Sequence, residues 1–269
     1  MRKYKYIFVV LVYRNIKDLA DFFECFKIHD SKVIVVNSFF DDQSMIDFKK
    51  LALEHGADFL NIDNKGYGYG NNRGCEYAMS HYDFDYIVIS NADIDILSFD
   101  EKQMDYRYVK GCNIIAPKIV NKRGINQNPN IPFNEPDLLL RLRYKAYLKN
   151  NIKAMYFFNA WSRITKAVFY YVFSFFSKRI YSAHGAFFIA TKCAVKKLFP
   201  FYNDDMFLFN EERFLAKKAR LAGVKTYYDN SIKIYHKEDG SVSLLDARIF
   251  DLLKQSYMEF YEYYYGKQE

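Results

Sequence analysis

The sequence predicts an α/β protein with a mostly parallel sheet and helices on both of its sides. Short apolar runs, such as residues 7–12 and 86–89, are typical of strands that are buried on both faces. Segments with apolar residues at helical spacing separate these runs, as in βαβ units. With 269 residues, of which 51% are hydrophobic, the chain is long enough for one large domain.

Strands and helices alternate through the first half of the chain. Strands are expected at residues 7–12, 33–36, 57–62 and 86–90. Apolar residues recur at helical spacing between 16 and 26. Asp42 or Ser44 can cap a second helix that ends at Gly56, and a short third helix is expected over 71–80.

The second half begins with a segment of different composition. Residues 138–180 are rich in aromatic side chains and contain nine Lys and Arg but no acid; removing these nine from the total of 39 leaves 30 basic against 32 acidic side chains. We therefore expect a basic, aromatic helical insert over 137–180 whose partner is a local anion. Its longest uncharged stretch, 167–177, is shorter than the roughly 20 residues that cross a bilayer. Two roles stay open, namely binding to an anionic membrane surface and packing as a subdomain or oligomer interface.

Mixed α/β structure is expected again over 181–236, followed by a helix over 243–265 with Asp246 in its first turn. The basic N-terminus and the apolar run after it are similar to a signal peptide. The run is short and no small-residue cleavage site follows, so a first strand is expected instead. The four cysteines are far apart and predict free thiols in a reducing compartment, hence a cytoplasmic protein; they are Cys25, Cys75, Cys112 and Cys193.

Polar clusters follow several predicted strands, and ligands of parallel sheets bind at that edge. Asn91, Asp93 and Asp95 alternate along an extended segment, so their oxygens can face one Mg²⁺ or Mn²⁺ ion. A capped turn is the alternative interpretation. Glu211 and Glu212 open a predicted helix among aromatic residues, a setting that raises a carboxylate pKa and suits a general base. A solvated first helical turn is the alternative.

Two further segments have an open role. His236 follows a predicted strand, and His184 with Gly185 precedes another, so these residues either line a site or belong to the core. The segment Gly66–Gly70 lacks the G-x-G-x-x-G spacing and follows the third strand, which argues against a dinucleotide site. Its glycines either allow a nucleotide to approach the backbone or form a loop.

Six motifs, in this order, resemble those of family 2 glycosyltransferases with the GT-A fold, particularly those that build bacterial surface polysaccharides such as capsule or O-antigen. The motifs are Tyr13-Arg14-Asn15, residues 34–38, Asn64 to Gly74, residues 89–93, His184 to Phe188, and Phe207 to Glu212. The resemblance covers about residues 5–123 and 181–243.

The resemblance implies an inverting transfer of a hexose from a UDP- or dTDP-sugar to a hydroxyl of a saccharide or a polyprenyl-linked saccharide. It assigns Asp93, with Asp95 and His236 as further ligands, to Mg²⁺ or Mn²⁺, and Glu212 to the base, with Glu211 as second candidate. His184 and Gly185 fall on the acceptor side. The positions assigned to the nucleotide sugar are Tyr13, Asn15, Asn37, Asn64, Gly66, Gly70, Asn71, Asn91 and Asp93.

The chain also departs from the pattern of this family. Asn37 and Asn91 stand where acids are usual, which leaves the base preference and the metal affinity open, and Glu212 replaces the commoner Asp.

One domain over 1–269 is expected, with a donor-binding part at 1–123, the insert at 137–180, an acceptor and catalytic part at 181–242, and a C-terminal helix at 243–269. The protein is expected in the cytoplasm, including at the inner face of the membrane, and a homo-oligomer stays open. A pyrophosphorylase is disfavoured because no glycine-rich loop follows the first strand. A non-catalytic protein that binds nucleic acid or membrane through the basic segment is the alternative. Nucleic acid is not an expected partner, because the rest of the chain is acidic and no RNA-binding motif occurs.

Overall fold

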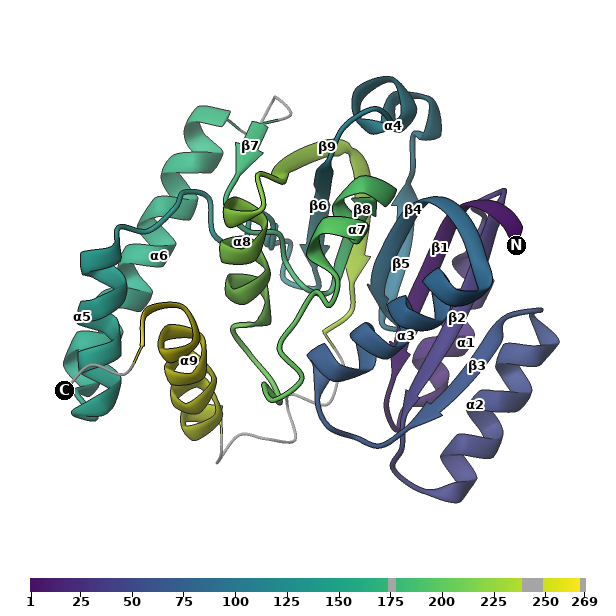
Figure 1. Cartoon of the computed structure of the whole chain (residues 1–269), viewed down its shortest axis with the longest axis horizontal. Helices are drawn as coiled ribbons and strands as arrows, with labels where there is room; N and C mark the ends of the chain where they lie inside the picture. The colour runs from purple at the N-terminus through teal and green to yellow at the C-terminus, as the bar shows by residue number, and fades with distance from the viewer. Residues whose placement is uncertain (174–177, 239–248, 267–269) are drawn as a thin grey trace.

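The computed structural model describes residues 1–173, 178–238 and 249–266. At its centre is a nine-stranded sheet with the order β3-β2-β1-β4-β8-β6-β9-β5, and β7 pairs with β9 (Figure 1). The strands are β1 (Arg2–Val12), β2 (Ser31–Ser38), β3 (Asp58–Ile62), β4 (Tyr82–Asn91), β5 (Ile94–Ser98), β6 (Asn113–Asn121), β7 (Lys178–Ile180), β8 (Phe187–Thr191) and β9 (Lys225–His236). All but β5, β7 and β8 run in one direction, so the predicted fold class is confirmed.

Helices cover both faces of the sheet. They are α1 (Ile16–Cys25), α2 (Asp42–Glu54), α3 (Tyr67–His81), α4 (Glu101–Tyr108), α5 (Asp137–Leu148), α6 (Ile152–Phe173), α7 (Lys192–Leu198), α8 (Glu211–Leu221) and α9 (Ile249–Tyr265). Alternate residues of β1 point to opposite faces: Phe8 packs in a core with α1, α2 and α4, and Val9 in a core with α3, α7 and α8. The expected pattern of a strand buried on both faces is thus present.

Helix α3 begins at Tyr67, earlier than the expected start at residue 71, so Gly68 and Gly70 are helical and do not form a loop. A Cβ atom on Gly70 would lie 2.5 Å from Cδ1 of Leu11 in β1. These glycines therefore let the helix pack closely on the sheet, and glycine's low helix propensity is outweighed by that contact.

One other helix start differs from expectation, and a further one is not tested. The N-cap of α2 is Asp41, whose Oδ1 accepts from the backbone N–H of Ser44 at 2.7 Å, and not Asp42 or Ser44 itself. The C-terminal helix is described from Ile249 onward, so Ser243 and Asp246 lie outside the described residues.

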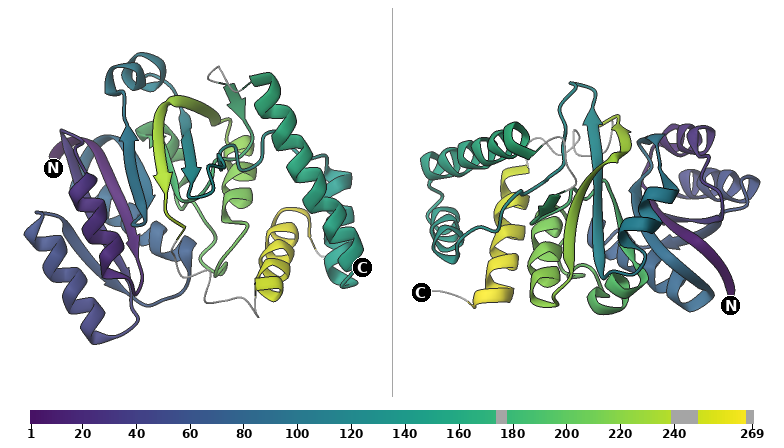
Figure 2. Two further views of the ribbon diagram at one scale, coloured as in Figure 1. Left: turned by 180° about the vertical axis from the view of Figure 1, so that it is seen from behind. Right: turned by 90° about the horizontal axis from the view of Figure 1, so that it is seen from above.

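The basic segment folds into two helices, α5 and α6, followed by the short strand β7. Together with α9 these helices flank one end of the sheet (Figure 2). A separate apolar cluster joins α5 and α9 to α8; it includes Leu140, Tyr144, Phe214, Tyr257 and Phe260. Within the three described ranges, no helix combines the length and the apolar character that spanning a membrane requires.

The expectation of four free thiols is wrong, because Cys112 and Cys193 form a disulfide. Cys112 precedes β6, whereas Cys193 lies in α7 directly after β8. Since β6 and β8 are neighbouring strands, the fold joins two cysteines that are 81 residues apart in sequence. Cys25 and Cys75 remain free, the first exposed and the second buried.

Candidate active site

The carboxyl ends of the parallel strands bring the polar clusters to one edge of the sheet. In the strand register, Leu11 pairs with Asn91, and Asn37 pairs with both Val12 and Asn61. Farther along the same edge, the last residue of β6 pairs with His236 at the end of β9. Segments that are distant in sequence are therefore aligned side by side, as the fold class requires.

Asp93 and His236 form a buried pair at this edge. Oδ2 of Asp93 lies 3.2 Å from Nε2 of His236. The other ring nitrogen, Nδ1, lies 2.7 Å from Oε1 of Gln127, and the Gln127 amide donates its own N–H to Glu238. Gln127 is thus oriented as an acceptor toward His236, which places the proton of a neutral ring on Nδ1.

This arrangement leaves an unshared electron pair of His236 Nε2 facing the carboxylate of Asp93. Two such acceptors at 3.2 Å need a proton or a cation between them. An imidazole with a second-shell partner and a carboxylate are together a donor set that suits a divalent metal. Asp93 and His236 therefore fit the expected Mg²⁺ or Mn²⁺ ion.

Asp95, expected as a further ligand, has a different environment. Its carboxylate lies 3.1 Å from Nζ of Lys237, which also bonds to Asp21 of α1. In the part of the chain that the structure describes, no group of three or more His, Cys, Asp or Glu side chains could hold a metal. The protein thus contributes two neighbouring ligands here, and the predicted three-residue set is not assembled.

Glu212 lies in the first turn of α8. Two consecutive residues with positive φ, Phe209 (73°) and Asn210 (60°), direct the chain into this helix. The Asn210 amide donates to Oγ of Ser256 in α9 at 2.9 Å, which ties the helix start to the C-terminal helix. Oε1 of Glu212 accepts from the backbone N–H of Gly185 at 3.2 Å. Backbone strain of this kind is concentrated at functional sites.

The two adjacent glutamates differ in protonation tendency. Burial raises the pKa of Glu211 well above its ordinary value, and the charge of Glu212 adds to the effect. Burial also raises the pKa of Glu212, but the N–H of Gly185 and the charge of Lys166 act in the opposite direction. Phe207, expected to desolvate this pair, is itself exposed, so the desolvation comes from other contacts. Glu212 is the better candidate for an ionised base.

Tyr67 and Gly185 lie between the Glu211–Glu212 pair and Asp93. The Tyr67 hydroxyl donates to the Gly185 carbonyl at 2.7 Å, while the Gly185 N–H bonds to Glu212. Burial raises the pKa of Tyr67, and the carboxylates of Glu212, Glu211 and Asp93 raise it further. Carboxylates from both acidic clusters therefore lie close enough to affect one phenol.

His184 is a neutral member of the same group. Its ring centroid lies 5.9 Å from that of His236. Burial, together with the neighbouring His236 ring and the charge of Lys166, lowers the pKa of His184 to about 3. Its Nδ1 accepts from the N–H of Ala186 at 3.1 Å, so the proton of the neutral ring is on Nε2. His184 can therefore donate a hydrogen bond to a sugar hydroxyl.

The residues expected at the nucleotide sugar have several different roles. The Asn15 side chain caps α1 by accepting from Lys17 N at 3.2 Å. Asn37 and Asn71 are fully buried, and Oδ1 of each has no partner among the described residues. Asn64 lies in the loop between β3 and α3 and is exposed.

Gly66 makes contact with the segment before α8. A Cβ atom there would lie 2.2 Å from the carbonyl oxygen of Phe207, and the φ angle is +110°. The Tyr67 N–H donates to the same carbonyl at 2.9 Å. Gly66 thus allows the start of α3 to meet the segment leading to Glu212.

Tyr13 belongs to an exposed group at the ends of β1 and β2. Its ring packs edge-on against Phe40 at 5.7 Å, and the Arg14 guanidinium lies 3.9 Å from the centroid of Phe40. Aromatic and cationic groups of this kind suit the stacking of a nucleobase. Phe40 carried no recognisable motif in the sequence.

Several other contributors to the site were missed for a similar reason. Gln127 and Asn128 come from the irregular segment after β6, to which no pattern pointed. Gln127 orients His236, and the Asn128 side chain accepts from the backbone N–H of His184 at 2.7 Å. Tyr67 was hidden in the glycine-rich segment, and Lys166 lay in the basic insert. Only the assembled fold brings them together.

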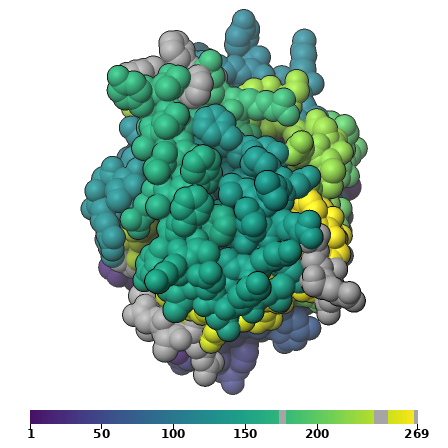
Figure 3. Space-filling view, turned by 90° about the vertical axis from the view of Figure 1, so that its left-hand side faces the viewer, coloured from purple at the N-terminus to yellow at the C-terminus, as the bar shows by residue number. Residues whose placement is uncertain are grey.

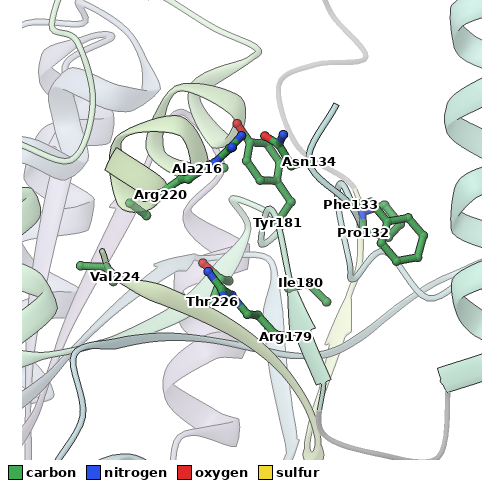
Figure 4. Close-up of a pocket in the computed structure, with 11 residues that line it drawn as sticks. Pro132, Phe133, Asn134, Arg179, Ile180, Tyr181, Ala216, Arg220, Val224 and Thr226 are labelled. Carbon is green, nitrogen blue, oxygen red and sulfur yellow. The ribbon is translucent and has the colours of Figure 1, made fainter. Parts of the chain in front are cut away.

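A separate pocket lies beyond the candidate site, between α8, β7 and the segment 132–134 (Figure 4). Its volume is about 330 Å³, and its lining includes Arg179, Arg220 and Tyr181 but no carboxylate. Neither Asp93 nor Glu212 lines it, so the chemistry described above lies elsewhere.

No family model matches the chain, and no curated protein is similar to it at a significant level. Solved structures, however, share its fold. The crystal structure of GalNAc-T7 with UDP, GalNAc and Mn²⁺ matches 87% of the chain with a TM-score of 0.60 and 10% identity, over 44% of its own length. S. aureus TarS matches 87% of the chain with a TM-score of 0.53 and 15% identity, over 36% of its length.

The chain thus spans less than half of these two proteins. A shorter form, S. aureus TarS 1–349, matches 97% of the chain with a TM-score of 0.50 and 11% identity, over 72% of its length. At such low identity these similarities show a shared GT-A-like fold.

Proposed function

We propose that the chain is a glycosyltransferase that transfers a hexose from a UDP- or dTDP-sugar to a hydroxyl of a saccharide or lipid-linked saccharide. One observation carries the proposal: the Asp93–His236 pair and Glu212 meet around residues 184–186 at the ligand-binding edge of the sheet. Further support comes from the shared fold, because the matching GalNAc-T7 structure contains UDP, GalNAc and Mn²⁺.

Asp93 and His236 are the residues that would hold Mg²⁺ or Mn²⁺. Two protein ligands suffice for such an ion when a diphosphate provides further oxygens. When bound, the metal neutralises the charge that develops on the departing nucleotide diphosphate. Gln127 keeps the His236 ring in the orientation and tautomer that this role needs.

Glu212 takes the proton from the acceptor hydroxyl. The acceptor oxygen forms a bond to the anomeric carbon, and the bond from that carbon to the diphosphate oxygen breaks with inversion. The half-buried carboxylate of Glu212 accepts from the Gly185 N–H, whereas Glu211 is buried and its pKa is raised further by the charge of Glu212. Glu211 is therefore the second candidate for the base.

The remaining features of the proposal rest on the motif resemblance. They are membership of family 2, an inverting course, a role in surface-polysaccharide synthesis, and an acceptor carried on a polyprenyl group. A cytoplasmic location was expected from four free thiols, and the Cys112–Cys193 disulfide removes that argument. His184, as a neutral donor beside the site, is the residue we assign to an acceptor hydroxyl.

A screen of nucleotide sugars tests the proposal most directly. The protein is mixed with UDP- and dTDP-hexoses, with Mn²⁺ or with a chelator, and both the melting temperature and nucleotide release are measured. We expect one donor to raise the melting temperature and to be hydrolysed only when metal is present. If no donor binds in either condition, the chain is not a nucleotide-sugar enzyme.

A further inference from the structure

Helix α6 has apolar side chains on two opposite faces. Met155, Phe158 and Phe169 on the inner face are buried against the rest of the protein. On the other face lies an exposed row of apolar residues, here called the outer stripe: Phe157, Trp161, Ile164, Val168 and Tyr171. Its members are three or four residues apart, so they lie on one side of the helix. The exposed fraction ranges from 43% for Trp161 to 91% for Tyr171, although a helix on a protein surface normally has a polar outer face.

Basic side chains lie in the same segment as the outer stripe. Residues 138–180 contain nine Lys and Arg and no acid. Among these, Arg141, Lys149, Lys153 and Arg163 are exposed. Side by side, α5 and α6 form a broad surface at this end of the molecule (Figure 3). The segment that forms this surface thus combines an exposed apolar row with exposed cations.

We propose that the α5–α6 surface docks on an anionic lipid bilayer, with α6 lying in the plane of the interface. Trp, Tyr and Phe side chains favour the headgroup region, and Lys and Arg are attracted to anionic lipids. The helix lies on the bilayer and does not cross it, in keeping with the finding that no described helix is apolar enough to span.

A second copy of the chain is a poorer partner for this surface. A two-fold interface places the same patch of both copies face to face. The basic residues of one copy would then meet those of the other, and no acid within 138–180 compensates them.

The inner face of α6 connects this surface to the candidate site. The Tyr170 hydroxyl donates to the carbonyl of Asn126 at 2.8 Å and also to that of Asn128. The loop so held carries Gln127, which bonds to His236. On the proposed function, docking would present the site to an acceptor that is carried in the membrane; the docking itself does not depend on that function.

The single tryptophan of the chain, Trp161, reports docking without any label. The full-length protein is mixed with vesicles of phosphatidylcholine alone, or with roughly 30% phosphatidylglycerol to make them anionic. We expect Trp161 emission to shift to the blue, and the protein to co-sediment, only with the anionic vesicles. Raising the salt from about 0.05 M to about 0.5 M should reverse both effects. No shift and no co-sedimentation at low salt would overturn the proposal.

Variants identify the surface. Phe157→Ser with Ile164→Ser, and separately Lys153→Glu with Arg163→Glu, should each reduce partition into anionic vesicles by about tenfold or more. Tyr106→Ser on α4 is the control, because Tyr106 is a large aromatic side chain that is 92% exposed, like Tyr171 in the stripe at 91%, but lies outside the basic segment. If Tyr106→Ser weakens binding as much as the others, the surface is wrongly assigned. Circular dichroism melts establish that each variant is folded.

Two further measurements separate the remaining outcomes. A dimer in solution that Phe157→Ser dissociates, without vesicle binding by the wild type, would assign the stripe to a second copy. Donor hydrolysis is measured on the same samples without lipid. If the wild-type protein hydrolyses a donor but does not bind vesicles, docking is refuted and the proposed function stands. If it binds vesicles but hydrolyses no donor, only the proposed function is refuted.

Discussion

Glu211 and Glu212 are adjacent in sequence, yet the helix directs their carboxylates into different surroundings. Glu212 is half-buried and bonds to the Gly185 N–H, whereas Oε1 of Glu211 is buried and has no partner among the described residues. The sequence could indicate a pair of acids at a helix start but not which of them faces the site. That distinction depends on the strained Phe209–Asn210 turn.

Replacing Glu212 by Gln should slow turnover strongly while preserving donor binding. The amide oxygen can still accept from Gly185 N, but the side chain cannot take a proton, so we expect kcat to fall by about 10²- to 10⁴-fold. Steady-state kinetics and a donor titration measure the two effects. Glu54→Gln on the exposed end of α2 serves as the control. Undiminished kcat in the Glu212 variant would transfer the role to Glu211.

Lys166 should set the lower pH limit of the activity. The base is active when ionised, so kcat/KM is expected to fall as the pH drops through the raised pKa of Glu212. The charge of Lys166 lowers that pKa. In Lys166→Met the fall should therefore occur at a higher pH, and Lys166→Arg should restore the wild-type profile. A pH–rate profile that is the same in all three proteins would show that Lys166 does not act on the base.

Glu211 should make the protein less stable as the pH rises. Its pKa is raised in the folded state above the ordinary value of 4.5, so the folded state binds the proton more tightly than the unfolded chain does. The contribution of Glu211 to the free energy of unfolding is therefore fully present below pH 4.5. It is lost as the pH rises through the folded-state pKa. Glu211→Gln removes the effect and should stabilise the protein by about 1–2 kcal/mol at pH 8. Urea unfolding at pH 5 and pH 8 measures it; equal stability of both proteins at pH 8 would contradict the assignment.

At the scale of elements, the strand–helix alternation was predictable because buried parallel strands leave continuous apolar runs. Helix starts were less predictable. The start of α3 was missed because Gly68 and Gly70 disfavour a helix locally, and only contact with the sheet compensates. The helical insert was expected from its composition, but its two opposite apolar faces follow from the packing of α6 against the core.

A buried ion triad joins α8 to α5. Glu135 accepts from Arg143 at 2.8 Å and from Arg213 on its other oxygen, and all three residues are buried. Glu135→Gln would leave two buried guanidinium groups without a counter-charge, so we expect a loss of about 3–5 kcal/mol. Chemical denaturation measures the loss. The exposed pair Lys50–Glu54 is the control, because Glu54→Gln should change the stability by less than about 1 kcal/mol. Similar losses of stability in Glu135→Gln and Glu54→Gln would mean that the buried triad contributes no more than an exposed ion pair.

At the scale of the whole molecule, the candidate site is made from the edge of one sheet and two additions to it. Strand ends provide Asp93 and His236, and α8 provides Glu212. The insert provides Tyr170, which holds the 126–128 segment that orients both histidines. The strand ends could be inferred from the sequence, since parallel strands end at a common edge. The contacts with the insert could not, because they depend on long-range packing without a local pattern.

The Cys112–Cys193 disulfide gives the last prediction. It links the start of β6 to α7 and closes a long loop, since the two residues are 81 positions apart. Cross-linking a loop of this length restricts the unfolded chain, so reduction should lower the free energy of unfolding by about 2–4 kcal/mol. The loss is measured by urea unfolding with and without reductant. Cys112→Ser with Cys193→Ser should match the reduced wild type and no longer respond to reductant.

Mass spectrometry after alkylation should find two free thiols, on Cys25 and Cys75, in the oxidised protein. Four alkylated cysteines in protein purified without reductant would contradict the pairing, and would restore the expectation of a fully reduced chain.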